Sequence, residues 1–468
     1  MARKYRILFL SQPTTGHVNT LLTMALQMRE EGHSVRFLLP GSRLPFKLIK
    51  VVADRVRMLQ AATAVPRSLR KYNLFYDIVN VPVTVGLQSI LLPYATGYRE
   101  TRYAFDLMSR GTGYYTRHIL RYLEQNEFDV LVSDFALPAS HIAAEITGTP
   151  CAVVFHSGLP FKGDGVPPFG SGLPIGDSFS DAYDRCVRVE KKYLTRLDKR
   201  LDTVREKWGL SPFPREYLRE PYSHWLNLVV SASAIEAPRD NLTEGTFFVG
   251  PCFHNRTVHD DMFPFERLRD DRFKIYVSLG SVFNNKPQVF RAIMTGLDKP
   301  EYQVIVSAGS AYNTLRNERV PDNVLLFRWV PQVSLLPKVD MVIGHGGNNS
   351  TNEVLAAGKP LIVIPIGGEQ GDNARRVEYL GAGLRVDLGS LNAEVVADKA
   401  AQIRFESKFV ARTLEIKEVL DKTDGAKTAS KLIQRLAETK KPLKRPSSIP
   451  LTVTMNDHIS LDANWDAA

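Results

Sequence analysis

Two short apolar runs on either side of a glycine-rich turn constrain the fold of this chain more than any other feature. Residues 341–343 and 361–366 have the length and the β-branched content of buried parallel strands. Residues 345–347, His-Gly-Gly, lead from the first run into a predicted short helix. Backbone N–H groups at a helix N-terminus are unpaired and favour negative charge. The stretch therefore predicts a phosphate-binding strand–turn–helix unit.

Capping residues define the expected helix. Ser350 is a suitable N-cap, Glu353 follows at the spacing of a capping box, and Gly358 is a suitable stop. The simpler alternative is an ordinary βα unit in which Ser350 and Glu353 only cap the helix. The turn alone does not decide between a binding site and this alternative.

Polar residues at neighbouring strand ends favour the binding site. Trp329 and Gln332 precede the turn, and Glu369, Gln370 and Asn373 follow it, each near the end of a predicted strand. In an open α/β sheet, groups beyond the carboxyl ends of the strands line a single crevice. We therefore expect these side chains to surround one ligand.

The complete stretch resembles the donor-binding signature of the nucleotide-sugar-dependent UDP-glycosyltransferases, the family with plant secondary-product and bacterial natural-product enzymes. The signature reads W-x-P-Q, then H-x-G-x-N-S-x-x-E, then P-x-x-x-(D/E)-Q-x-x-N. This many fixed spacings is a far more specific match than a lone glycine motif. The chain matches it at Trp329, Gln332, His345, Gly347, Asn349, Ser350, Glu353, Pro365, Glu369, Gln370 and Asn373.

The resemblance implies the GT-B fold, an α/β architecture of two Rossmann-like domains whose parallel sheets face each other across a cleft. It also implies that Trp329 stacks on uracil and that Gln332 and Glu353 hold the ribose. Many plant members carry Trp where this chain has Gly367, so the resemblance leaves the sugar open. The implied donor-binding set is Gly280, Ser281, Trp329, Val330, Gln332, His345, Gly347, Asn348, Asn349, Ser350, Glu353, Glu369 and Gln370.

His17 and Asp134 are the candidate catalytic residues. Residues 5–10 and 34–39 are predicted strands around a helix at 20–31, and His17 lies in the loop between the first strand and that helix. Asp134 stands at the end of a predicted strand at 128–133. Either residue alone could simply cap a helix. By resemblance, His17 is the general base and Asp134 orients it.

The predicted domains follow from the remaining patterns. Residues 50–125 are expected to be mostly helical, and the resemblance implies that they line the acceptor pocket. Residues 226–231 are predicted as the last strand of the first domain. Residues 395–436 are expected to be helical. The expected segments are an acceptor-binding domain at 1–250, a linker at 251–271, a nucleotide-sugar-binding domain at 272–425, a helix crossing back at 426–440, and a disordered tail at 441–468.

Composition excludes several other classes. The net charge of +10 is spread along the chain without aromatic interleaving, so we expect no nucleic acid as a partner and at most loose membrane-surface contact. Three scattered cysteines fit a cytoplasmic protein without disulfides. The first strand is not followed by G-x-G-x-x-G, so a nicotinamide-dinucleotide site is not expected. No D-x-D triplet occurs, so we expect neither a metal nor a cofactor beyond the UDP-sugar co-substrate.

These patterns together predict an inverting glycosyltransferase. It would move a sugar from a UDP-sugar to a hydroxyl of a small, largely apolar acceptor. The alternatives are a dTDP-deoxysugar transferase, a nucleotide-sugar epimerase on the same fold, and a non-catalytic nucleotide-binding relative. The sequence predicts neither the acceptor nor the oligomeric state.

Overall fold

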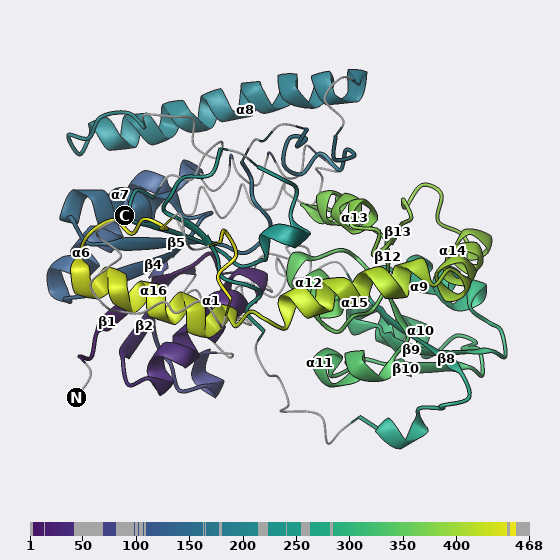
Figure 1. The fold of residues 1–468 in the computed structure, drawn as a ribbon. Coiled ribbons are helices and arrows are strands. Elements are labelled where there is room, and N and C mark those ends of the chain that lie inside the picture. The colour runs from purple at the N-terminus through teal and green to yellow at the C-terminus, as the bar shows by residue number, and fades with distance from the viewer. Residues whose placement is uncertain are drawn as a thin grey trace. The chain divides into compact units, whose positions relative to one another are not determined.

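A computed structural model describes the chain in two compact units (Figure 1). Unit 1 comprises residues 1–169, 176–254 and 422–468, and unit 2 comprises residues 170–175 and 255–421. The residues described are 3–13, 15–41, 69–80, 98, 102, 106, 109–161, 163, 165–176, 180–213, 223–239, 241–253, 263–280, 284–446 and 450–454. The strands and helices named below lie within these residues.

Unit 1 is built on a seven-stranded parallel sheet in the order β3-β2-β1-β4-β5-β6-β7. Its strands are β1 (Arg6–Leu10), β2 (Ser34–Gly41), β3 (Phe75–Asn80), β4 (Val130–Asp134), β5 (Cys151–Phe155), β6 (Leu226–Val229) and β7 (Thr246–Phe248). The register places Leu10 of β1 opposite Ser133 of β4, so both strands end at the same edge.

The two faces of this sheet bury different cores. Ile7 and Phe9 of β1 belong to one cluster, whereas Leu8 and Leu10 belong to the other, as the alternation of a strand requires. Helices α1 (Thr15–Glu30) and α16 (Gly425–Thr439) supply residues to the first cluster. Helices α6 (Thr112–Gln125), α7 (Pro138–Thr147) and α8 (Asp181–Glu206) supply residues to the second. A short helix η2 (Ser233–Ile235) follows β6.

Unit 2 repeats the architecture with a six-stranded parallel sheet in the order β10-β9-β8-β11-β12-β13. Its strands are β8 (Phe273–Ser278), β9 (Tyr302–Ser307), β10 (Val324–Phe327), β11 (Met341–Gly344), β12 (Leu361–Val363) and β13 (Gly383–Arg385). Its helices are η4 (Phe265–Arg267), α9 (Pro287–Gly296), η5 (Gly309–Ala311), α10 (Tyr312–Leu315), α11 (Gln332–Leu335), η6 (Leu336–Lys338), α12 (Asn348–Ala356), α13 (Gln370–Tyr379), α14 (Ala393–Phe405) and α15 (Lys408–Leu420).

Each sheet reverses its strand order once. The reversal lies between β1 and β4 in unit 1 and between β8 and β11 in unit 2. Ligands of open α/β sheets bind beyond the carboxyl ends of the strands at such a switch point. His17 follows β1 and Asp134 ends β4, while Gly280 follows β8 and His345 follows β11. Both sets of predicted residues therefore stand at switch points.

Several sequence-based expectations were wrong in detail. Helix α1 begins at Thr15 and not at residue 20, so His17 lies in its first turn and not in a loop. Residues 75–80, expected to be helical, form strand β3, because they pair in parallel with β2. β6 is not the last strand of unit 1, since β7 pairs with it. Residues 395–436, expected to be helical, are helical and lie in three helices, α14, α15 and α16.

The expectation of a disordered tail is wrong for residues 441–446 and 450–454. The Leu443 N–H donates to the Trp225 carbonyl at 2.9 Å, and Thr452 pairs with Phe248 beside β7. Leu443 and Val453 are buried because they complete the core that α16 covers. Residues 455–468 lie outside the described part. No described helix is long and apolar enough to cross a bilayer.

Candidate functional site

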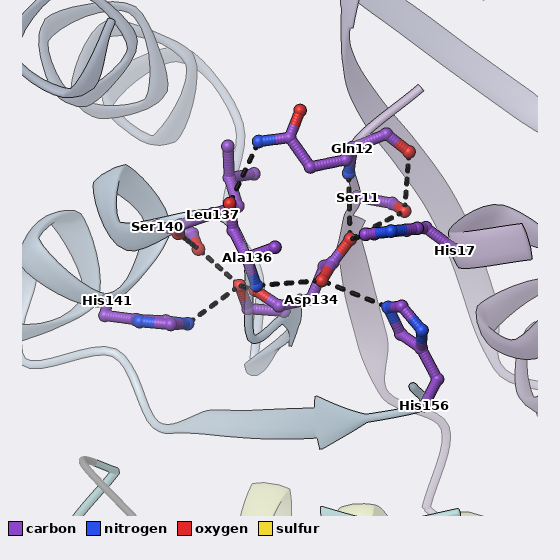
Figure 2. Close-up of polar contacts among 10 residues, drawn as sticks. Ser11, Gln12, His17, Asp134, Ala136, Leu137, Ser140, His141 and His156 are labelled. Atoms are coloured by element: carbon purple, nitrogen blue, oxygen red, sulfur yellow. Dashed lines mark hydrogen bonds and ion pairs between the residues drawn. The ribbon is translucent and has the colours of Figure 1, made fainter. Parts of the chain in front are cut away.

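The first half of the candidate site is centred on Asp134, the last residue of β4. One carboxylate oxygen, Oδ2, lies 2.6 Å from His17 Nδ1 and accepts from the Gln12 N–H at 3.1 Å (Figure 2). The other oxygen, Oδ1, accepts from the Ala136 N–H at 2.9 Å and lies 3.2 Å from His156 Nε2. The structure thus brings His17 and Asp134 together and adds His156, which our sequence analysis missed.

The fold explains why these side chains meet. β1 and β4 are adjacent, and α1 starts directly after the short loop that follows β1, so its first turn lies over the end of β4. His156 follows β5, which pairs with β4 on its other side. A polar residue at the end of a strand adjacent to the predicted aspartate was the signal in the sequence that could have identified it.

The electrostatic environment keeps Asp134 ionised. Burial alone would raise the pKa of this fully buried carboxyl, but His17 and His156 outweigh that effect and hold the pKa well below its usual range. A carboxylate can only accept hydrogen bonds. His17 therefore presents Nδ1–H to Asp134, and its Nε2 is left as the ring nitrogen that can take a proton from a substrate.

His17, Asp134 and His156 also have donor atoms of the kind that bind metal ions. One ligand atom from each residue lies within 4.8 Å of the others. Imidazole nitrogens and a carboxylate oxygen are suitable ligands for zinc. The His17–Asp134 distance of 2.6 Å is that of a charge-assisted hydrogen bond. The three residues therefore satisfy one another's hydrogen-bonding groups, with Asp134 as the shared acceptor.

A small apolar cavity lies at the same edge of the unit 1 sheet. It lies among the ends of the first three strands and two helices, and its lining includes Leu10, Leu38, Pro40, Val79, Tyr115, Ile119 and Leu137. Leu10 is the last residue of β1, the strand that leads to His17. Part of the expected acceptor region, residues 81–97, lies outside the described residues. The described lining is apolar.

The second half of the candidate site begins at Trp329, after β10. Its side chain is 48% exposed, which leaves a ring face that a flat base can stack on. Val330, by contrast, is buried. The Gln332 amide NH₂ donates to Glu353 Oε2, and its oxygen accepts from the Tyr276 hydroxyl at 3.3 Å. The structure therefore brings together Gln332 and Glu353.

His345 is packed between two glycines. A Cβ atom built on Gly280 or on Gly347 would lie 2.5 or 2.6 Å from the His345 ring, so neither position has room for a side chain. Gly280 also has φ +72°, which favours glycine. Burial lowers the pKa of His345 to about 4, so its imidazole is neutral at pH 7. A neutral imidazole carries a single N–H, and the backbone of Ser278 accepts a hydrogen bond from the ring.

Helix α12 begins at Asn348, with Gly347 as its N-cap. The predicted N-cap role of Ser350 is therefore wrong, because Ser350 lies inside the first turn. Asn349 and Ser350 lie in that turn, where unpaired backbone N–H groups are expected. The Asn348 side chain is buried, and its oxygen accepts from Arg376 at 2.7 Å, which fixes α12 to α13. Ser281 lies outside the described residues.

Glu369 and Gln370 begin helix α13, where Glu369 is the N-cap residue. The Gln370 side-chain oxygen accepts from the Ile366 and Gly367 N–H groups at 2.7 and 3.1 Å. These bonds commit the oxygen of the amide to the preceding loop. Because the amide oxygen is bound to this loop, Gln370 can offer a ligand only the N–H groups of its NH₂.

Residues 170–175 pack with unit 2 at this same helix start. The Gly170 and Gly172 N–H groups both donate to the Asp372 carboxylate, the second at 2.7 Å. The Gly172 carbonyl accepts from Arg385 at 2.7 Å and from Arg375 at 3.2 Å. A Cβ atom on Gly371 would lie 3.0 Å from Gly172 Cα. The segment is therefore fitted closely against the residue that follows Gln370.

Comparison with known proteins identifies the family of this chain. The family described as "UDP-glucoronosyl and UDP-glucosyl transferase" matches residues 13–403, which include both halves of the candidate site. The chain belongs to this family. It is therefore a sugar-transferring enzyme, and its donor is a nucleotide sugar.

Individual relatives are distant, and they cover different shares of the chain. The 4'-demethylrebeccamycin synthase of Lentzea aerocolonigenes is 26% identical over 92% of this chain and 99% of its own length. The uncharacterized UDP-glucosyltransferase YojK of Bacillus subtilis (strain 168) is 28% identical, over 46% of this chain and about half (53%) of its own length.

Solved structures of glycosyltransferases share the GT-B fold with this chain, as predicted. The glycotransferase of kitacinnamycin has a TM-score of 0.71 at 18% identity, covering 94% of this chain and all of the other. Glycosyltransferase VinC in complex with DTDP has a TM-score of 0.61 at 18% identity, covering 92% of this chain and 99% of the other.

Proposed function

We propose that this enzyme transfers a sugar from a UDP-sugar to a hydroxyl group of a small, largely apolar acceptor, with inversion at the anomeric carbon. The observation that carries the proposal is the 2.6 Å contact between His17 Nδ1 and Asp134 Oδ2. This contact leaves His17 Nε2 as a base whose ordinary pKa lies near neutrality. The half-buried His17 side chain, 22% exposed, is accessible to a hydroxyl group.

The proposed step is a single displacement. His17 Nε2 takes the proton of the acceptor hydroxyl while its oxygen attacks the anomeric carbon. The bond from that carbon to the diphosphate oxygen breaks, and the electron pair leaves with UDP. Asp134 stabilises the imidazolium that forms, as the aspartate of a serine hydrolase triad does. An α-linked donor would give a β-glycoside.

The donor half of the site supports a uridine diphosphate as the leaving group. Trp329 offers a ring face for uracil, and the bonded pair Gln332 and Glu353 offers oxygen acceptors for the ribose hydroxyls. The first turn of α12 can donate hydrogen bonds to the departing diphosphate, and His345 packs beside it. Glu369 and Gln370 at the start of α13 would hold the sugar hydroxyls.

The acceptor is proposed from the apolar cavity and from the relatives. The cavity at the carboxyl ends of β1 and β2 is lined by aliphatic and aromatic side chains. The cavity itself, about 10 Å³, has room for no more than one water molecule, so its apolar lining and not its volume supports a largely apolar ligand. The names of a rebeccamycin-type synthase and of a kitacinnamycin glycotransferase indicate natural products as acceptors in related enzymes. A hydroxylated natural product is the acceptor class that we infer.

A dTDP-sugar is the second candidate donor, because the similar structure of VinC is a complex with DTDP. Thermal melting with UDP, dTDP and GDP separates the candidates. A ligand at 100 times its dissociation constant stabilises the folded protein by about 2.7 kcal/mol. A larger shift with UDP than with dTDP supports the proposed donor, and the reverse order would replace it with a dTDP-sugar.

The base is tested by His17→Ala. We expect turnover to fall by about 10²- to 10⁴-fold, the usual contribution of a general base, while UDP binding stays unchanged. Turnover that survives the substitution would refute the base assignment. Incubation with the donor alone is a second test, since an epimerase would convert it without any acceptor.

A further inference from the structure

His156 is a buried histidine that takes no direct part in the proposed displacement. It follows β5 in unit 1 and is only 3% exposed. Its Nε2 lies 3.2 Å from Asp134 Oδ1, whereas His17 binds the opposite oxygen, Oδ2 (Figure 2). A single carboxylate therefore lies between two histidine side chains.

The two imidazole rings also contact each other directly. Their centroids are 4.2 Å apart, with the ring planes inclined by 62°, so the arrangement is edge-to-face. Phe135 lies close to both rings, with centroid distances of 6.4 Å to His17 and 5.3 Å to His156. Rotation of the His17 ring away from Asp134 is restricted by these contacts.

The protonation state of His156 follows from its surroundings. Burial lowers its pKa, and the neighbouring His17 lowers it further, which outweighs the opposite effect of Asp134. A neutral imidazole carries one N–H, and the ionised Asp134 can only accept. His156 therefore donates Nε2–H to Oδ1. The nearby titratable groups are His17 from α1, Asp134 from β4 and His141 from α7, whose Nε2 contacts Ser133 at 3.2 Å.

We propose that His156 is a positioning residue for glycosyl transfer, which holds the Asp134 carboxylate in place and keeps it from accepting the proton that His17 carries. A hydrogen bond donated to a carboxylate stabilises its ionised form. When His17 becomes an imidazolium, the proton on Nδ1 must stay on the ring, so that the positive charge lies beside the acceptor. The His156 bond lowers the proton affinity of Asp134 at that moment.

A purely structural role predicts different behaviour from a positioning role. A buried histidine that only fills space would affect folding stability and leave the titration of His17 alone. The positioning role couples the two, because loss of the His156 donor concentrates negative charge on the carboxylate. Asp134 would then attract the His17 proton more strongly and raise the pKa of His17. The acid limb of the pH profile of kcat/KM reflects the pKa of the base in the free enzyme. This limb would therefore move to higher pH.

The test compares His156→Phe with His156→Gln in steady-state glycosyl transfer as a function of pH. Phenylalanine keeps a ring but has no donor, whereas the glutamine amide nitrogen can occupy the place of Nε2. We expect His156→Phe to lower kcat by about tenfold or more, to shift the acid limb to higher pH, and to leave the KM for the donor unchanged. His156→Gln should restore the position of the limb and part of kcat.

His33→Phe is a matched control for the cost of replacing a buried histidine. His33 precedes β2 at the opposite edge of the same sheet, and its Nδ1 accepts from the Tyr5 N–H at 3.2 Å. This variant should melt at a lower temperature without any shift of the acid limb. An unmoved limb in His156→Phe, or equal impairment of His156→Gln and His156→Phe, would overturn the positioning role.

This inference rests on the proposed function of His17 as the base, and His17→Ala separates the two. If His17→Ala is inactive and the limb is unmoved in His156→Phe, only the role of His156 fails. If His17→Ala keeps full turnover, the base assignment fails, and the positioning role fails with it.

Discussion

His17 and Asp134 are 117 residues apart in the sequence, yet His17 Nδ1 lies 2.6 Å from Asp134 Oδ2. The contact is possible because β1 and β4 are neighbours at the point where the strand order of the sheet reverses. Asp134 is fully buried, whereas the His17 side chain is partly exposed. The pair therefore combines a shielded negative charge with a partly exposed imidazole ring.

Asp134→Asn tests the electrostatic part of this pair. Asparagine has the same shape but no charge, so it can neither stabilise an imidazolium nor fix the His17 tautomer. We expect turnover to fall by about 10²- to 10⁴-fold. UDP affinity, measured by calorimetry, should not change, because the donor-binding residues are in unit 2. A loss of less than tenfold would show that the charge of Asp134 is not needed.

Trp329→Ala tests the proposed stacking on uracil. Stacking of a base on an aromatic side chain contributes about 1–3 kcal/mol, so UDP should bind roughly 5- to 150-fold more weakly. Trp329→Phe should keep much of the affinity because it retains a ring. Trp208 at the end of α8 has a similar exposure, 41% against 48%, and is the matched control. Trp208→Ala should bind UDP normally, and equal losses in the two alanine variants would contradict the stacking.

The central sheet strands, such as the runs at 5–10 and 341–343, were predictable because they are short, apolar and buried on both faces, whereas β3 was expected to be helical and β7 was missed. The glycine-rich turn was predictable because the His345 ring leaves no room for a side chain at Gly280 or Gly347, so both positions require glycine. The starts of α1 and α12 were not, because Thr15 and Asn348 have weak helix propensity, which a tertiary contact outweighs at Asn348. Arg376, which binds the Asn348 side chain, provides one such contact.

The residue pairs of the candidate site could be predicted only where both residues lie at the ends of neighbouring strands, because those ends share one edge of the sheet. The sequence indicated Asp134 and His17 through their positions after strands. It did not indicate His156, because a histidine after an apolar strand is more often a core residue. The packing of residues 170–175 against Asp372 also escaped prediction, since a glycine- and proline-rich loop carries no pattern that names its partner.

Histidines that are neutral in the folded protein should make it sensitive to mild acid. Burial lowers the pKa of His345 to about 4 and that of His141 to about 3. In the unfolded chain each histidine titrates near its ordinary value of about 6.5, so the unfolded state binds more protons below that pH. The contribution of these groups to stability is complete above pH 6.5 and is lost as the pH falls toward their folded pKa values.

In that window, each such histidine lowers the free energy of unfolding by at most about 1.4 kcal/mol for every pH unit of acidification. Asp134 acts in a lower window, because its folded pKa is depressed, so its contribution is lost only below the ordinary pKa of aspartate. Melting temperatures should therefore fall between pH 6.5 and 4. His141→Gln should lose less on acidification than the unmodified protein. An equal loss would assign the acid sensitivity to other groups.

Zinc should inhibit the enzyme although transfer is proposed to need no metal. The donor atoms of His17, Asp134 and His156 lie within 4.8 Å of one another, and zinc could bind them if the ring protons leave. Inhibition should therefore be stronger at pH 8 than at pH 6, and EDTA should reverse it. EDTA alone should leave turnover unchanged.

His156→Phe and His156→Gln locate the inhibitory zinc. Both variants remove one imidazole ligand, so both should require at least about tenfold more zinc for half inhibition, consistent with the sensitivity of metal sites to their ligands. Unchanged sensitivity would place the inhibitory ion elsewhere. Loss of turnover in EDTA, restored by magnesium or manganese, would contradict metal independence, because then a cation and not the residues around α12 would neutralise the leaving diphosphate.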